Sequence, residues 1–366
     1  MQNHQSLSRI RKIATFVFIN VAVTLILLEC VLQVVFSIGW DAEQHHKKTS
    51  LLIQKIYWTL KPHTSWEEYF IINHANGADL VYANLHQPHA TRGWSMIPGA
   101  HNENTHINAQ GYRALYNYEN RPDKYQVLIV GDSFTFGDEI DDEHTWPHLL
   151  QAQNDKLNVL NMGGSGYGTD QMLVTLQEEI QHYRPNLVIA AFIDDDLKRA
   201  MIPFRDYKKP QFILAHKQLQ LTNTPIGDTQ QVLKELSHKC FYSYGRIQSL
   251  SLFHYLTTDL TLMESEPDAS DTTKINTAIF EKMQALANEN HADFMLVYLP
   301  NGDELSSRDF KSPGETFFYQ YIASHTLASL NPRQALLDAP FEKSSGHYKS
   351  EENNLLSRLV LEKIKP

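Results

Sequence analysis

Ser133 stands at an abrupt Gly-Asp-Ser turn that directly follows the apolar run Val127–Val130. A short apolar run that ends at a turn is typical of a buried strand. The serine hydroxyl is therefore expected at the carboxyl edge of a sheet, where open α/β sheets bind ligands and a turn N–H can donate to an oxyanion. The alternative interpretation is an ordinary strand-to-turn junction, in which Asp132 and Ser133 bond only to local backbone groups.

His347 is the candidate general base for this serine. It lies in the stretch Ser345–Tyr348, in the last loop before a helix expected over Ser350–Ile364. A serine hydroxyl is a weak nucleophile until a neutral imidazole accepts its proton, which the imidazole can later return to the leaving alcohol. Fixed N–H donors stabilise the tetrahedral oxyanion, and each donor is worth about 3 kcal/mol in the barrier.

Two further stretches follow expected strands and would lie near the same site. Asn161–Thr169 contains glycines that allow close backbone approach with exposed N–H groups. Its Gly-Gly-x-Gly-x-Gly order lacks the spacing of a dinucleotide-binding fingerprint. Ile193–Leu197 follows the next strand and carries three consecutive aspartates.

A parallel sheet would bring these strand ends to one edge. Beyond Arg121, short apolar runs alternate with amphipathic segments, which predicts crossover connections and a mostly parallel sheet covered on both faces. The expected strands are Gln126–Val130, Asn158–Leu160, Leu187–Phe192, Asp293–Leu299 and a shorter one near Ala335–Leu337. The expected helices are Thr145–Gln153, Asp170–His182, Thr273–Asn290, Glu315–Leu330 and Ser350–Ile364. The sequence therefore predicts a doubly wound α/β domain.

In this order the four stretches resemble the SGNH, or GDSL-type, serine hydrolases, from about Ile107 to the C-terminus. The resemblance implies a flavodoxin-like α/β fold and an esterase or acyl-transfer activity without a cofactor. By position, Ser133 matches the nucleophile, whose own N–H would form part of the oxyanion hole, and Gly163 matches a second N–H donor. His347 matches the general base, and Asp132 would brace the turn.

The sequence departs from the family pattern at two positions. Asp195 stands where the family has an oxyanion-hole asparagine, and an ionised carboxylate would repel an oxyanion. Either Asp195 is protonated or it has another role, such as pairing with Arg199 one helical turn on. The aspartate that usually precedes the histidine is replaced by serine, so Asp338 or a main-chain carbonyl is left to orient the imidazole of His347.

The N-terminal part of the chain predicts a membrane anchor. Residues 13–39 are almost continuously apolar, and a helix of this length reaches roughly 40 Å, enough to cross a hydrocarbon core of about 30 Å. Arg9, Arg11 and Lys12 precede the run, so the positive-inside rule leaves residues 1–12 in the cytoplasm and the remaining chain outside, in the periplasm. A cleaved signal peptide is the competing interpretation, although the run is long and no Ala-x-Ala site follows it.

The remaining chain is expected to have two parts. Residues 40–120 form a stalk and irregular segment that packs against the following domain, because it is too rich in Trp and Tyr for a free linker. Its end, Asn108–Arg113, reads Asn-x-x-Gly-Tyr-Arg and, with the anchor, looks like the membrane-attached bacterial branch of the family. Residues 121–366 form the SGNH-hydrolase-like domain, with an insertion at 201–272 that would shape the pocket.

Composition narrows the classes of partner. A net charge of −10 leaves no basic surplus to neutralise phosphates, so no nucleic-acid partner is expected. Two cysteines exclude a disulfide framework. The acidic run Asp138–His144 has no metal-loop spacing and is interpreted as the solvated approach to a helix.

Two hypotheses for function follow. The first is a membrane-anchored serine esterase or acyltransferase that acts on O-acyl esters of envelope glycans or lipids, through Ser133, Gly163 and His347. The second is a catalytically silent SGNH-like protein that binds an envelope polymer or partner protein, and it rests on Asp195 and the missing acid before His347.

Overall fold

The computed structural model describes residues 2–44, 66–67, 70, 85–216, 218–240 and 268–364. By its internal contacts the chain divides into two units. One unit comprises Met1–Ser65 and Lys234–Glu266, and the other comprises Trp66–Leu233 and Pro267–Pro366. The second unit contains the sheet and every residue of the candidate site, and the predicted domain boundaries stay predictions.

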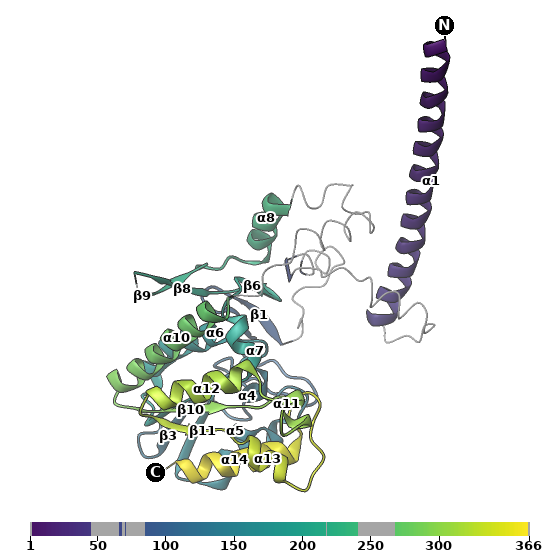
Figure 1. The fold of residues 1–366 in the computed structure, drawn as a ribbon. Coiled ribbons are helices and arrows are strands. Elements are labelled where there is room, and N and C mark those ends of the chain that lie inside the picture. The colour runs from purple at the N-terminus through teal and green to yellow at the C-terminus, as the bar shows by residue number, and fades with distance from the viewer. Residues whose placement is uncertain are drawn as a thin grey trace. The chain divides into compact units, whose positions relative to one another are not determined.

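A five-stranded parallel sheet lies at the centre of the second unit (Figure 1). Its strands, in spatial order, are β11 (Ala328–Leu330), β10 (Asp293–Tyr298), β5 (Leu187–Phe192), β3 (Tyr125–Val130) and β4 (Leu157–Asn161). All four neighbouring pairs are parallel. Parallel neighbours require crossover connections, so the predicted doubly wound α/β arrangement is confirmed.

Helices cover both faces of this sheet (Figure 1). One face is packed by α6 (Thr169–Tyr183), α10 (Ala269–Glu289) and α12 (Pro313–Ser324). The other is packed by α5 (Trp146–Gln153), α13 (Arg333–Asp338) and α14 (Ser350–Lys363). Along β3, Leu128 and Val130 join the first core, whereas Val127 and Ile129 join the second. Both faces are buried, which explains why residues 127–130 read as one continuous apolar run.

Two expected elements near the end of the sheet were wrong. Ala335–Leu337, expected as a strand, lies inside α13, and the edge strand is β11 instead. The helix expected to reach Leu330 ends at Ser324. The edge strand forms by hydrogen bonding to β10. The apolar pattern of one segment does not show which other segment it will pair with, so this strand could not be predicted from the pattern.

Residues 85–120, the longest described stretch of the predicted stalk, pack against the sheet domain. It begins with an antiparallel hairpin, β1 (His86–His89) and β2 (Gly93–Met96). The buried Trp94 donates its indole N–H to the Ser165 carbonyl at 3.0 Å, and the Tyr167 hydroxyl donates to the Trp94 carbonyl at 2.7 Å. Residues 45–65, 68–69 and 71–84 of this segment lie outside the described residues.

The predicted insertion contains two small antiparallel pairs. These are β6 (Phe204–Arg205) with β7 (Tyr207–Lys208), and β8 (Gln211–Ala215) with β9 (Gln218–Thr222), followed by α8 (Thr229–Cys240). Lys209 anchors this region, because its buried ammonium group donates to a carboxylate oxygen of Asp170 at the start of α6. Residues 241–267 lie outside the described residues.

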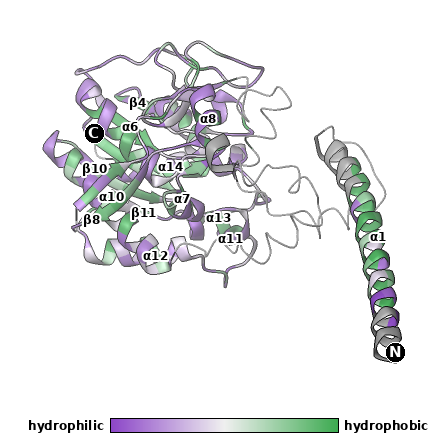
Figure 2. Ribbon diagram, turned by 90° about the horizontal axis from the view of Figure 1, so that it is seen from above, coloured by the Kyte–Doolittle hydropathy of each residue, from purple (hydrophilic) through white to green (hydrophobic). Residues whose placement is uncertain are grey.

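The N-terminal segment forms α1 (Gln2–Gln44), which belongs to the first unit. Its 22 residues from Arg11 to Leu32 are long and apolar enough to cross a membrane. Figure 2 shows this helix coloured mostly as hydrophobic, with hydrophilic positions towards its N-terminal end. Apolar side chains such as Phe16 and Phe18 are exposed along it.

His89, at the end of β1, makes the stability of the domain depend on pH. Burial, together with the charge of Arg92, lowers the pKa of His89 from 6.5 to about 4. Between pH 6.5 and 4, His89 therefore binds a proton in the unfolded chain but stays neutral in the folded chain. The stabilising contribution of His89 to the free energy of unfolding is therefore complete above pH 6.5 and is lost as the pH falls towards 4. We expect His89→Asn to flatten the decline in the free energy of unfolding between pH 6.5 and 4. Urea titrations at a series of pH values measure it, and a slope equal to that of the wild type would contradict this account.

Candidate active site

The Ser133 turn has no room for a side chain before it. A β-carbon added to Gly131 would lie 2.1 Å from the Thr135 hydroxyl and 2.9 Å from the Ala191 carbonyl oxygen. The chain then enters the short helix α4 (Ser133–Phe136), whose N-cap Asp132 accepts from the Phe134 N–H at 3.0 Å. Glycine at 131 therefore lets the strand end and the helix begin within two residues, which places Ser133 at the carboxyl edge of the sheet.

Asp132 is fully buried beneath the turn. Its Oδ2 lies 3.4 Å from the Ser133 hydroxyl and 3.5 Å from Nη1 of Arg199. Burial raises the pKa of Asp132, and the Arg199 guanidinium opposes that rise. The contacts of Asp132 match the bracing role predicted from the sequence, since it caps α4 and is itself paired.

His347 faces Ser133 across the sheet edge. Its Nε2 lies 2.9 Å from the Ser133 hydroxyl oxygen, and its ring contacts Phe134 with 5.0 Å between ring centroids. Glu352, in the first turn of α14, holds the preceding loop by accepting from the Ser344 N–H at 2.8 Å and from the Ser344 hydroxyl. The structure thus brings the predicted serine and histidine within hydrogen-bonding distance.

The other nitrogen of the imidazole faces a residue that sequence reasoning missed. Oε1 of Glu139 lies 3.1 Å from Nδ1 of His347. The contact has the length of an ion pair but not the angles of a hydrogen bond, and this buried Nδ1 makes no hydrogen bond within the described part of the chain. Glu139 belongs to the acidic run after Ser133 that was interpreted as a solvated approach to a helix.

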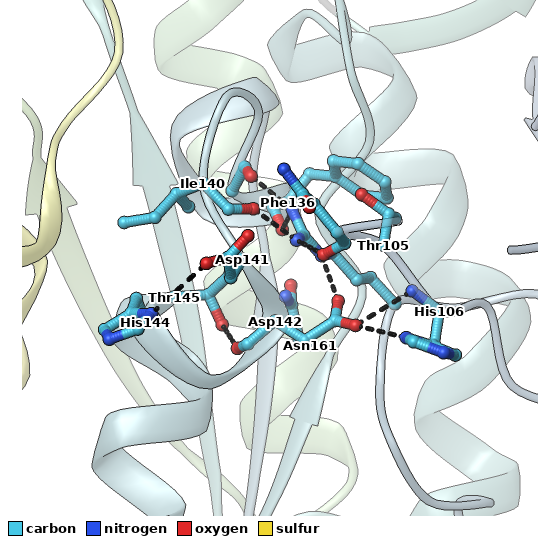
Figure 3. A network of polar contacts seen from close by, with 12 residues as sticks. Thr105, His106, Phe136, Ile140, Asp141, Asp142, His144, Thr145 and Asn161 are labelled. Atoms are coloured by element: carbon cyan, nitrogen blue, oxygen red, sulfur yellow. Dashed lines mark hydrogen bonds and ion pairs between the residues drawn. The ribbon is translucent and has the colours of Figure 1, made fainter. Parts of the chain in front are cut away.

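Two aspartates of that acidic run are also engaged with protein. Asp142 is buried, accepts from both the backbone and the ring of His106 at 3.0 and 2.7 Å, and accepts from Nε of Arg113 at 2.6 Å. Figure 3 shows His106 turned towards the Asp142 carboxylate. The Asp138 carboxylate accepts from the Ser165 hydroxyl at 2.8 Å. Asp138 and Asp142 are therefore fixed at the site edge, whereas Asp141, Glu143 and His144 are exposed, so the interpretation as a solvated segment was wrong only for part of the run.

Gly163, the predicted second oxyanion donor, has another partner for its N–H. It donates to the Asn161 side-chain oxygen at 3.0 Å. The next amide, of Gly164, donates to the Gly131 carbonyl at 3.0 Å. Among the described contacts of this loop, the amides of Ser165 and Gly166 donate no hydrogen bond and are therefore unpaired donors, unlike those of Gly163 and Gly164.

Asp195 lies in the first turn of α7 (Asp194–Arg199). Its side chain is 57% exposed, and its Oδ2 lies 3.8 Å from Nη2 of Arg199, as the alternative in the sequence analysis anticipated. The buried carboxylate of this turn is Asp196, which accepts from the Ile193 N–H at 2.9 Å and from Arg199 at 2.7 Å. In this arrangement the Asp195 side chain faces solvent and Arg199.

Asp338, predicted as a possible orienting acid, makes its contacts elsewhere. Its carboxylate accepts from Arg308 at 2.6 Å and from Gln334 at 2.7 Å. These two hydrogen bonds lower the pKa of Asp338. The acid recorded beside His347 is Glu139, from a different part of the chain.

The fold and these side chains define an α/β protein with a serine–histidine pair at the carboxyl edge of a parallel sheet. No protein-family model and no curated protein matches the sequence.

The chain is similar to solved structures of GDSL type. They include a member of the lipolytic protein G-D-S-L family from Veillonella parvula, with 12% identity and a TM-score of 0.38 over 65% of this chain and 96% of that one. They also include a GDSL-like lipase from Bacteroides thetaiotaomicron, with 14% identity and a TM-score of 0.34 over 65% and 88%. A catalytic mutant of the acetylxylan esterase Axe2 from Geobacillus stearothermophilus has 12% identity and a TM-score of 0.37 over 67% and 96%. Because these identities and scores are low, the function is inferred below from the residues of the site.

Proposed function

We propose that this protein is a membrane-anchored serine esterase or O-acyltransferase that acts on O-acyl esters of envelope glycans or lipids. The observation that carries the proposal is the 2.9 Å contact between the Ser133 hydroxyl and Nε2 of His347. These residues lie far apart in the sequence and meet at the edge where α/β sheets bind ligands. A base within hydrogen-bonding reach of a serine is the arrangement that nucleophilic catalysis requires.

The reaction follows from this geometry. Nε2 of His347 takes the hydroxyl proton as the Ser133 oxygen attacks the acyl carbonyl, and the carbonyl oxygen becomes an oxyanion. The Ser133 N–H, at the start of α4, and a free amide of the loop after β4 donate to that oxyanion. His347 then protonates the departing alcohol, which leaves an acyl-serine. Water or a sugar hydroxyl then attacks this ester and gives its proton to His347. His347 returns that proton to the Ser133 oxygen as the acyl–serine bond breaks, which releases the acid or the new ester.

The proposed location rests on α1. Its apolar span is preceded by Arg9, Arg11 and Lys12, which favours a cytoplasmic N-terminus and an extracytoplasmic site. Esters of the envelope are then the substrates within reach of an anchored enzyme. The same contact between Ser133 and His347 disfavours the catalytically silent alternative, since a binding protein has no need of it.

A biotinylated fluorophosphonate tests both parts of the proposal on membranes that contain the full chain. We expect labelling at Ser133, located by peptide mass spectrometry, and a labelled chain that stays in the pellet after an alkaline carbonate wash. Heat-denatured protein is the control for non-specific reaction. Folded protein that takes no label would overturn the serine hydrolase, whereas a labelled chain that washes into the supernatant would overturn only the anchor.

A further inference from the structure

The carboxylate of Glu139 lies against the loop that carries His347. Oε1 is 3.1 Å from Nδ1 of the imidazole, on the nitrogen that does not face Ser133. A β-carbon added to Gly346 would lie 3.8 Å from Oε2 of Glu139, so the second oxygen also faces this loop. We propose that Glu139 is a positioning residue, which keeps the proton of neutral His347 on Nδ1 and so leaves Nε2 free to accept the proton of Ser133. The inference deepens the proposed function and rests on it.

The chemistry requires an acceptor at this place. Nε2 can act as a base only in the tautomer that carries its proton on Nδ1, and an acceptor beside Nδ1 stabilises that tautomer. Within the described residues, this buried Nδ1 has no hydrogen-bond partner, and Glu139 is the carboxylate recorded beside it. Catalytic hydrogen bonds are often poorly aligned without substrate and tighten in the complex, so 3.1 Å is within reach of the aligned bond.

The backbone of Glu139 is held in an unusual conformation. Its φ is 65°, in the left-handed region, and Gly137 two residues earlier has a φ of 95°. A glutamate in this region is uncommon and persists only where surrounding contacts over-determine it.

Arg113 supplies those surrounding contacts. Its guanidinium is almost fully buried and donates to the carbonyl oxygens on both sides of Glu139, at Gly137 and, at 2.6 Å, at Ile140. It also donates to the Asn104 carbonyl at 2.9 Å, and Asp142 neutralises it. Figure 3 shows Ile140 and Asp142 within this one network. The segment before the sheet domain therefore fixes the loop that presents Glu139 to His347.

Glu139→Gly tests this role with little disturbance of the loop, because glycine adopts a positive φ without strain. We expect kcat for p-nitrophenyl acetate to fall by at least about tenfold with KM within about twofold, since the acid acts through the base and not on the substrate. The side chain is 73% exposed, which makes the loss smaller than for a buried acid. The same exposure lets a small carboxylate enter, so sodium formate should restore most of kcat in Glu139→Gly.

The matched control is Asp338→Asn, which removes an exposed carboxylate that pairs with Arg308. It should retain the kcat of the wild type and show no response to formate. The positioning role would be overturned if Glu139→Gly retained the kcat of the wild type. It would also be overturned if formate raised kcat of the wild type and of His347→Ala by the same factor as that of Glu139→Gly. A wild type that neither hydrolyses the ester nor takes the fluorophosphonate would instead overturn the proposed function, so the two failures are distinguishable.

Discussion

Replacing Ser133 with alanine is expected to lower kcat for p-nitrophenyl acetate by on the order of 10⁴-fold or more. The alanine has no oxygen to attack the acyl carbonyl, and only binding and the oxyanion donors are left. His347→Ala should cause a loss of similar size, because the hydroxyl 2.9 Å away then has no base. The measurement is initial-rate kinetics on the full chain in detergent.

The double variant gives the sharper result. If Ser133 and His347 act as one unit, Ser133→Ala/His347→Ala should be no slower than either single variant. Either substitution alone already abolishes the attack of Ser133 assisted by His347, so the other substitution has nothing further to remove. His325→Ala is a suitable control, because that ring stacks on Tyr321 away from this pair. Losses that multiply in the double variant would mean that the two residues contribute independently, contrary to the proposed mechanism.

Replacing Lys209 with alanine is expected to lower the free energy of unfolding by about 3–5 kcal/mol, the largest stability effect that we anticipate. Lys209 and Asp170 are completely buried, and the ammonium group also donates to the Arg199 carbonyl at 2.9 Å. Burial lowers the pKa of Lys209 and raises that of Asp170, and the pairing opposes both shifts. Loss of the lysine leaves a carboxylate without its counter-charge in the core.

Urea unfolding followed by tryptophan fluorescence measures this effect, because Trp94 and Trp146 are buried. Lys209→Met/Asp170→Asn, which removes both charges, should recover most of the loss because no unpaired ion is left. A loss below about 1 kcal/mol for Lys209→Ala would contradict the account. The Lys209–Asp170 pair also lies near the candidate site. It joins the insertion to the start of α6, which directly follows the loop after β4.

Part of the fold was predictable because its signals are local. The runs at 127–130 and 187–192 are buried on both faces and therefore apolar without interruption, and both lie in strands of the structure. β11 was missed because it is an edge strand of three residues whose hydrogen-bonding partners come from β10.

The sequence by itself determined the position of Ser133 and the character of α1. An apolar run followed by Gly-Asp-Ser predicts a strand that ends at a sharp turn, and a long apolar run predicts a helix of membrane-spanning length. Only the tertiary structure decided which acid faces His347 and which amides of the loop after β4 are free. Those outcomes depend on contacts such as Arg113 with the carbonyls around Glu139, and on hydrogen bonds such as Gly163 to Asn161. Such contacts form between segments that approach only when the sheet assembles, so no spacing along the chain encodes them.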